Sequence, residues 1–231
     1  MNKFHFWAIL MLPVLAISCK KDSGTSTPAV KFMSLTTGST WNFKLTNNPS
    51  STSTPVTNYT LTATSGDSVA NAKTYKIFTN SSGANEYYNI TGSDYYTYRK
   101  LPAALGGASI EVLYLKDNAA LNDTWSQTTP ITVSGFTLNL TLTNKIAQKG
   151  ISRTVNGITY TDVIDVETTL SVSGIPVFIT YSLISDIHYY YAPKYGQIEN
   201  NTKIDFTASG IPGFTPVHFE QRTELQSATI L

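Results

Sequence analysis

The chain of 231 residues contains one cysteine, Cys19, so it cannot form a disulfide within itself. Its 16 Lys and Arg residues are nearly balanced by 15 Asp and Glu residues, and these charges are scattered along the sequence. Because binding to a phosphate backbone requires clustered cations, we do not expect nucleic acid as a partner. Beyond the N-terminal region, no apolar run approaches the ~20 residues that a membrane-spanning helix needs.

Histidine is also scarce, with three residues in the whole chain. His5 lies in the apolar N-terminal segment, while His188 and His218 fall in separate expected strands and have no neighbouring partner at a metal-ligand spacing. A catalytic triad or a zinc site requires side chains that converge, and the sequence shows no such group. We therefore predict no catalytic residues, no metal site and no cofactor.

One dense acidic group occurs, formed by Asp162, Asp165 and Glu167. On a strand, Asp165 and Glu167 share one face and Asp162 points to the other, so the three do not form a carboxylate pair. We interpret them as solvent-facing charges that discourage pairing at a sheet edge. Paired acids for glycoside hydrolysis could still come from distant strands.

The N-terminus has the features of a secretory signal. A positive start at Met1-Asn2-Lys3 precedes an apolar stretch from Phe4 to Ile17 that is too short to span a bilayer comfortably. The segment Leu15-Ala16-Ile17-Ser18-Cys19 resembles the lipobox of bacterial lipoproteins, in which the cysteine becomes the new N-terminus and carries acyl chains such as palmitate. An ordinary signal peptide with an incidental cysteine is the alternative.

This resemblance implies a division of the chain into three parts. Residues 1–18 form the signal peptide, and residues 19–31 comprise a lipidated Cys19 and a polar, flexible tether. Residues 32–231 form a single all-β domain. We expect a protein anchored by lipid to the bacterial cell envelope, at the outer membrane; the membrane face stays open.

Alternation of apolar and polar residues predicts strands through most of the chain. The clearest case runs from Phe136 to Ile146, and Ile131-Thr132-Val133 precedes it across Ser134-Gly135, which predicts a hairpin. Similar alternation marks the segments 59–63 and 177–183. Since no helical periodicity of ten residues or more occurs outside the signal, we predict an all-β domain of about a dozen strands.

A weak internal repeat adds detail to this prediction. Trp41 in "GSTWNF" and Trp125 in "NDTWSQ" are separated by nearly the same interval as Tyr75 in "NAKTYKIF" and Tyr160 in "NGITYTDVIDV". A further similarity relates "SDYYTYRK" to "HYYYAPKYGQI". We interpret the domain as two pseudo-repeats that pair into one continuous antiparallel sheet.

Three segments, "FMSLTTGSTWNFK" (32–44), "VLYLKDNAALNDTW" (112–125) and "YYYAPKYGQIE" (189–199), carry a resemblance to a group of uncharacterised bacterial envelope lipoproteins. The group has a Gly-x-x-Trp start motif and a Tyr-x-Ala-Pro-x-x-Gly closing motif. The resemblance implies a large curved antiparallel sheet, similar to the open half-barrels of periplasmic lipoprotein carriers. It implies no activity, because the group has none established.

Tyrosine is the feature with binding potential. Its side chains cluster in two segments, around Tyr95 and around Tyr190. Aromatic faces on a concave sheet can stack on sugars or line an apolar groove, and alternate tyrosines of a strand share a face. The candidate ligand-binding residues are Tyr96, Tyr98, Tyr189 and Tyr191.

The sequence therefore predicts a lipid-anchored envelope protein without enzymatic activity. Its β domain is expected to bind an apolar ligand, a glycan or a partner protein. An envelope polysaccharide hydrolase and a purely structural surface lipoprotein are the alternatives.

Overall fold

The computed structural model describes residues 30–49, 51, 54–100, 109–133, 136–210 and 216–231, and every regular element in these ranges is a β-strand. The strands are β1 (Thr40–Asn47), β2 (Val56–Ala70), β3 (Lys73–Asn80), β4 (Glu86–Thr91), β5 (Asp94–Lys100), β6 (Ser109–Lys116), β7 (Thr124–Val133), β8 (Phe136–Val155), β9 (Ile158–Ser173), β10 (Thr180–Ala192), β11 (Gly196–Ser209) and β12 (Val217–Thr229).

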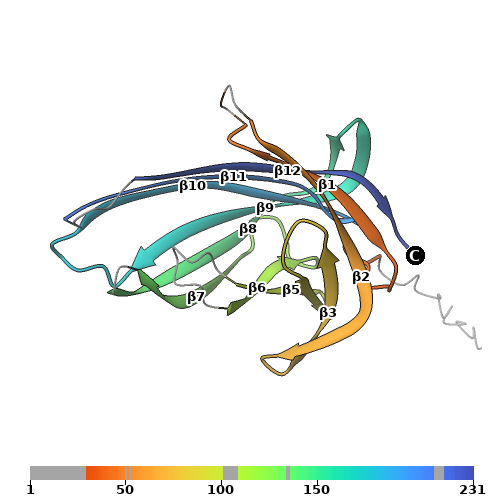
Figure 1. The fold of residues 1–231 in the computed structure, drawn as a ribbon, viewed down its shortest axis with the longest axis horizontal. Helices are drawn as coiled ribbons and strands as arrows, with labels where there is room; N and C mark the ends of the chain where they lie inside the picture. The colour runs from red at the N-terminus through yellow and green to blue at the C-terminus, as the bar shows by residue number, and fades with distance from the viewer. Residues whose placement is uncertain (1–29, 50, 52–53, 101–108, 134–135, 211–215) are drawn as a thin grey trace, which may run out of the picture.

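All twelve strands belong to one antiparallel sheet with the order β6-β5-β4-β3-β2-β1-β12-β11-β10-β9-β8-β7. The two halves of the chain are each a meander of six strands, and they join where β1 pairs with β12. The sheet curves until it is nearly closed, with the long strands β10–β12 extending along one side (Figure 1). The predicted fold class, a large curved antiparallel sheet, is confirmed.

The predicted hairpin at residues 131–136 is confirmed, since Val133 pairs with Phe136 and Ile131 with Leu138. Along β8, Leu140, Asn144 and Ile146 are buried, as the alternation predicts. These side chains lie on the concave face, where the main hydrophobic core forms. The strand predicted from the alternation at 177–183 begins later than expected. Strand β10 begins at Thr180, and Val177, which precedes it, is fully exposed.

The two ends of the sheet are joined by side chains. The indole Nε1 of Trp125 on β7 donates to the main-chain carbonyl of Leu113 on β6 at 2.8 Å. Asn144 Nδ2 on β8 donates to the same oxygen at 3.2 Å, and Gln127 Nε2 donates to the carbonyl of Glu111. The edge strand β6 thus has some of its carbonyl groups satisfied without a strand partner.

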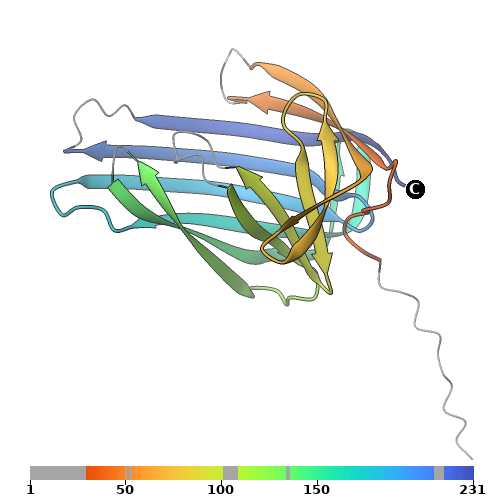
Figure 2. The ribbon, with the colours of Figure 1, turned by 60° about the horizontal axis from the view of Figure 1, so that its bottom comes forward.

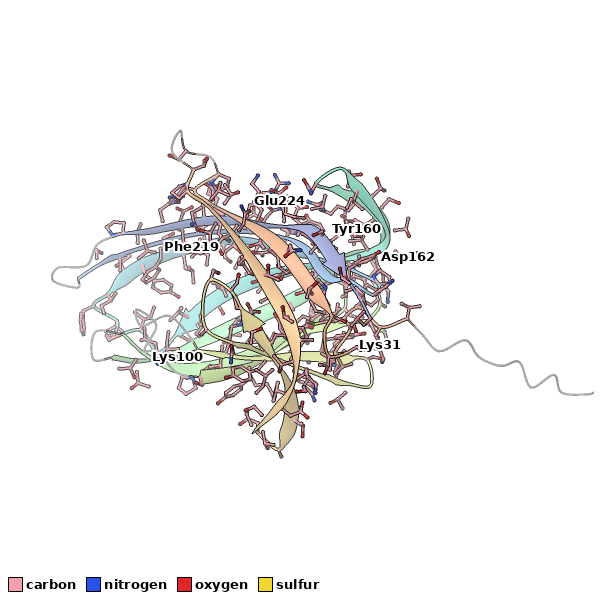
Figure 3. All side chains as sticks on the ribbon, turned by 45° about the vertical axis from the view of Figure 1, so that its right-hand side comes forward. Lys31, Lys100, Tyr160, Asp162, Phe219 and Glu224 are labelled. Carbon is pink, nitrogen blue, oxygen red and sulfur yellow. The ribbon has the colours of Figure 1, made fainter. Side chains whose placement is uncertain are left out.

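Two long hairpins bend out of the sheet. The β2–β3 pairing shifts between Ala63 and Asp67, and the β8–β9 pairing shifts three times between Ile146 and Arg153. Such irregularities bend and twist a strand pair. Figure 3 shows the tip of the β8–β9 hairpin, with Tyr160 and Asp162, above the end of the sheet.

The β8–β9 hairpin corrects the interpretation of the acidic group. Asp165 is 3% exposed and accepts a hydrogen bond from His188 Nδ1 at 2.8 Å, so it is not a solvent-facing charge. Strand β9 is also no edge, because it lies between β8 and β10. Glu167 does face solvent in part, and it pairs with Lys145 Nζ at 2.9 Å.

The segment that precedes β1 closes one end of the curved sheet. Lys31 accepts a hydrogen bond from Lys194 N at 2.6 Å, and Phe32 N donates to the Tyr95 hydroxyl at 3.0 Å. Met33 is buried and bridges to Tyr195. Lys31, which the sequence assigns to the end of the tether, therefore already contacts the domain.

The positions of the repeated residues can be compared with the strands. Trp41 and Trp125 are both the second residue of the first strand in their half, and Tyr75 and Tyr160 are both the third residue of the third strand. The similarity between the two tyrosine-rich segments does not correspond to matching strands of the two halves. "DYYTYRK" forms the fifth strand of the first half, whereas "HYYYA" ends the fourth strand of the second half.

Within the described residues, no helix is long and apolar enough to cross a membrane.

Candidate functional site

The concave face of the sheet encloses a cavity of about 770 Å³. Strands from both halves of the chain line it. Figure 2 shows the yellow-green strands β3–β5 in front of the cyan-to-blue strands β10–β12. Aromatic residues dominate the lining: Trp41, Phe43, Tyr59, Tyr87, Tyr88, Tyr98, Tyr114, Tyr189, Tyr191 and Tyr195. A concave, aromatic site with a few polar groups is typical of small-molecule and saccharide binding.

Strand β10 supplies two of the predicted residues, Tyr189 and Tyr191. They alternate with Tyr190, so both face the cavity while Tyr190 lies against the Arg153 guanidinium on the convex face. The two rings lie 6.3 Å apart at an angle of 16°. Tyr191 is 3% exposed and belongs to the hydrophobic core, whereas Tyr189 is only partly buried, so Tyr189 is the one of the two that can contact a ligand.

Strand β5 carries the other two predicted residues, and only Tyr98 lines the cavity. Tyr96 instead lies under the ammonium group of Lys73, 4.2 Å from its ring centre, and its hydroxyl donates to Asp94 at 3.3 Å. The structure therefore brings Tyr98, Tyr189 and Tyr191 to one cavity and places Tyr96 outside it.

Three aromatic lining residues from β1 and β2 were missed at the sequence level: Trp41, Phe43 and Tyr59. The alternation in "TWNFKL" places Trp41 and Phe43 on one face of β1, and Phe43 pairs directly with Tyr59, with ring centres 5.3 Å apart. The Trp41 indole Nε1 donates to the carbonyl of Tyr195 at 2.7 Å. That alternation was the available signal, but it could not show that β1 and β10 face each other.

The floor of the cavity contains a cluster of tyrosines. Tyr114 packs against Tyr88, Tyr95 and Tyr191, with ring centres 5.5 to 6.2 Å apart, and its hydroxyl contacts Met33 Sδ at 3.4 Å. Burial raises the pKa of Tyr88, Tyr114 and Tyr191 well above the ordinary value. These hydroxyls stay protonated at physiological pH and act as neutral hydrogen-bond donors.

Amide and hydroxyl side chains complete the wall. Gln221 Nε2 donates to Asn47 Oδ1 at 3.0 Å, and this bond orients the amide at the cavity. Gln197 makes no side-chain hydrogen bond with the described part of the chain. Thr168 Oγ1 donates a hydrogen bond to Asn144 Oδ1 at 2.7 Å, so these two groups already have partners.

Three charged residues line the cavity: Glu86, Arg99 and Lys100. Glu86 is the one carboxylate among its described lining residues, and it accepts hydrogen bonds from Tyr88 and from Asn80 Nδ2, the latter at 2.9 Å. Hydrolysis of a glycoside by the usual mechanism requires two carboxylates on either side of the bond. Glu86 alone does not meet that requirement.

The two histidines of the described residues, His188 and His218, lie on the convex face. His188 bonds to Asp165, and His218 Nδ1 lies 2.6 Å from Asp205 Oδ1. Among the described residues, no three His, Cys, Asp or Glu side chains are grouped so as to hold a metal ion. Cys19, the predicted lipidation site, lies outside the described residues.

No protein-family model matches this chain, and no curated protein matches its sequence. Its fold is similar to the crystal structure of a putative lipoprotein from Parabacteroides distasonis. The two chains share 11% sequence identity, and the match has a TM-score of 0.50 and covers 88% of this chain and all of the other. At this identity the similarity concerns the fold alone.

Proposed function

We propose that this protein is a lipoprotein of the bacterial outer membrane, anchored through Cys19, and that its β domain binds carbohydrate in the concave cavity without cleaving it. The observation that carries the proposal is the cavity lining, in which tyrosine faces stand beside amide groups.

The anchor rests on the sequence between Leu15 and Cys19. Each buried CH₂ group of an acyl chain contributes ~0.8 kcal/mol to membrane binding, so two or more chains hold a soluble domain at the bilayer almost permanently. The domain is hydrogen-bonded from Lys31 onward, which leaves residues 20–30 as the connection to the acylated cysteine. An anchored chain of this kind needs no membrane-spanning helix.

The chemistry of the cavity favours carbohydrate over an acyl chain. A sugar ring presents C–H groups on its faces, which stack on aromatic rings, and hydroxyls around its edge, which pair with amides and phenols. Tyr189 and Tyr59 offer ring faces and hydroxyls, and Gln197 and Gln221 offer amides. An acyl chain would leave the Tyr189 hydroxyl and the Gln197 amide without partners, at a cost of ~1–3 kcal/mol each.

The other two alternatives have less support. A hydrolase requires a second carboxylate beside Glu86, and the described lining supplies none. A purely structural protein has no need of an open cavity with ten aromatic residues in its wall.

Binding is tested by isothermal titration of the Cys19→Ser protein with a panel of neutral oligosaccharides. Tyr189→Leu retains apolar volume in the wall and removes the planar ring, so it should weaken binding at least about tenfold. Ser182→Ala, on the convex face of the same strand, should leave affinity unchanged. Absence of binding to every member of the panel would refute the carbohydrate proposal.

The anchor is tested separately. Mass spectrometry of the mature protein, isolated from bacterial membranes, should find an N-terminus at Cys19 with attached acyl chains, in the outer-membrane fraction of a density gradient. Cys19→Ser should release the protein into the soluble fraction. A mature chain that begins elsewhere, or that keeps a free thiol, would refute the anchor.

A further inference from the structure

The concave face of β10–β12 continues beyond the cavity. Strand β10 pairs with β11 without a register shift from Tyr181 to Tyr189. Strand β12 pairs with β11 without a shift from Val217 to Gln221. Because side chains alternate along a strand, every second residue on this path faces the same side as Tyr189. These residues are Tyr181, Leu183, Ser185, Ile187, Ile204, Phe206, Ala208, Val217 and Phe219.

Aromatic rings are exposed on this extension. Tyr181 is 41% exposed and Phe219 is 40% exposed, although both lie within regular strands on the concave face. The ring of Tyr181 lies 6.4 Å from that of Phe206, and its hydroxyl donates to the carbonyl of Val172 at 2.9 Å. This bond fixes the orientation of the ring before any ligand arrives.

Charge is divided sharply between the two faces of these strands. The concave positions from Tyr181 to Ile187 and from Val217 to Phe219 carry no ionisable group other than the Tyr181 phenol. The convex positions carry Asp186, Lys203, Asp205, His218 and Glu220. A ligand on the concave path therefore meets an uncharged surface, which suits a neutral chain rather than an acidic polymer.

The path is long. Eight residues separate Tyr181 from Tyr189, which corresponds to ~26 Å at the usual rise of a strand. Several pyranose rings in line span that length, whereas a disaccharide is too short to do so.

We infer that the concave face of β10–β12 is a second carbohydrate subsite, continuous with the cavity, and that the protein binds an extended neutral polysaccharide chain. The inference rests on the proposed function. Tyr181 and Phe219 supply the outer aromatic contacts, and Tyr189 supplies the inner one.

The test is isothermal titration of the full mature chain carrying Cys19→Ser with neutral β-linked glucose, mannose and xylose oligosaccharides of two and six units. The hexasaccharide of the recognised series should bind about tenfold more tightly than the disaccharide, because only the longer chain reaches the outer rings. Phe219→Ala should reduce this ratio to about threefold or less and leave disaccharide affinity unchanged. Ile184→Ala, an equally apolar and more exposed position on the convex face, should leave the ratio intact.

The outcomes separate the two proposals. If di- and hexasaccharide bind equally, or if Phe219→Ala weakens both alike, the outer subsite is refuted while carbohydrate binding stands. If no oligosaccharide of either length binds, the proposed function fails as well. A dimer in sedimentation that Phe219→Ala converts to a monomer, or displacement of bound hexasaccharide by palmitate, would assign the path to a second copy or to an acyl chain and would overturn the inference.

Discussion

The indole of Trp125 and the main-chain carbonyl of Leu113 are joined by a hydrogen bond of 2.8 Å between the two ends of a twelve-strand sheet. Trp41, the matching residue of the first half, makes a similar bond of 2.7 Å to the carbonyl of Tyr195. Trp125 thus ties the two end strands of the sheet together, and Trp41 ties β1 to the β10–β11 turn, beyond its neighbour β12. These two bonds help to fix the curvature that creates the cavity.

Trp125→Phe should lower the free energy of unfolding by about 1–2 kcal/mol, measured by denaturant titration. The loss is moderate because Asn144 Nδ2 also donates to the Leu113 carbonyl, so this oxygen is not left without a donor. Ser126→Ala, the next residue and exposed on the outer face, should change stability by less than about 0.5 kcal/mol. Equal effects of the two substitutions would contradict a closing role for Trp125.

Glu199 is a buried carboxylate on the convex face, 1% exposed, and it pairs with Arg153 Nε at 2.5 Å and Arg222 Nη2 at 3.1 Å. Burial opposes its ionisation, but the hydrogen bond and charge of Arg153 outweigh that effect and hold the pKa of Glu199 below its ordinary value. Glu199→Gln should therefore cost about 2 kcal/mol or more at pH 7 in denaturant unfolding, because Arg153 loses its charged partner and Arg222 keeps only Glu224.

The control for this prediction is Glu167→Gln. Its pair with Lys145 is far more exposed, so the substitution should cost at most about 1 kcal/mol. Since the pKa of Glu199 is lowered on folding, its contribution is present above the unfolded pKa and is lost as the pH falls through the folded value. A Glu199→Gln protein as stable as the native one at pH 7 would show that the pair contributes nothing.

His188 gives the opposite pH dependence. Its hydrogen bond to Asp165, partly opposed by burial, raises the pKa of His188 above the ordinary value of 6.5. The resulting stabilisation is complete below pH ~6.5 and is lost as the pH rises through the folded pKa. The stability difference between the native protein and His188→Gln, measured by urea unfolding, should thus be larger at pH 5.5 than at pH 9. A difference that is constant or grows with pH would contradict a charged pair.

Gly196 lies where the N-terminal segment meets the β10–β11 turn. Its φ is +73°, and an added Cβ would lie 3.3 Å from the carbonyl oxygen of Phe32. Gly196→Ala should cost about 2–3 kcal/mol in thermal or denaturant unfolding. Gly92→Ala has a similar φ of +60° but open space around the Cβ, so it should cost only about 1 kcal/mol. If both cost the same, the close approach of Phe32 has no energetic role.

The strands themselves could be predicted from alternation, because a half-buried strand leaves a period of two in the sequence. The pattern from Phe136 to Ile146 gave both the strand and its buried face. Closure of the sheet could not be predicted, since Trp125 and Asn144 bond to Leu113 through a contact that no local pattern encodes. The burial of Asp165 was missed for a related reason: the bends in the β8–β9 hairpin depend on register shifts that cannot be read from residue types.

The candidate site was predicted in part. Tyr189 and Tyr191 could be placed on one face by their spacing, and they do line the cavity. Tyr96 was a natural candidate by the same reasoning, and it shares a face of β5 with Tyr98, but spacing does not show that Lys73 covers its ring. The opposing wall, with Trp41 and Tyr59, required knowledge of which strands face each other across the fold.

The most direct test of the account is a crystal structure of the Cys19→Ser protein with a bound neutral hexasaccharide. We predict one sugar ring stacked within ~4 Å of the Tyr189 ring and the chain leading along β10–β12 toward Phe219. A saccharide bound on the convex face, or a cavity that stays empty at saturating hexasaccharide, would contradict the account.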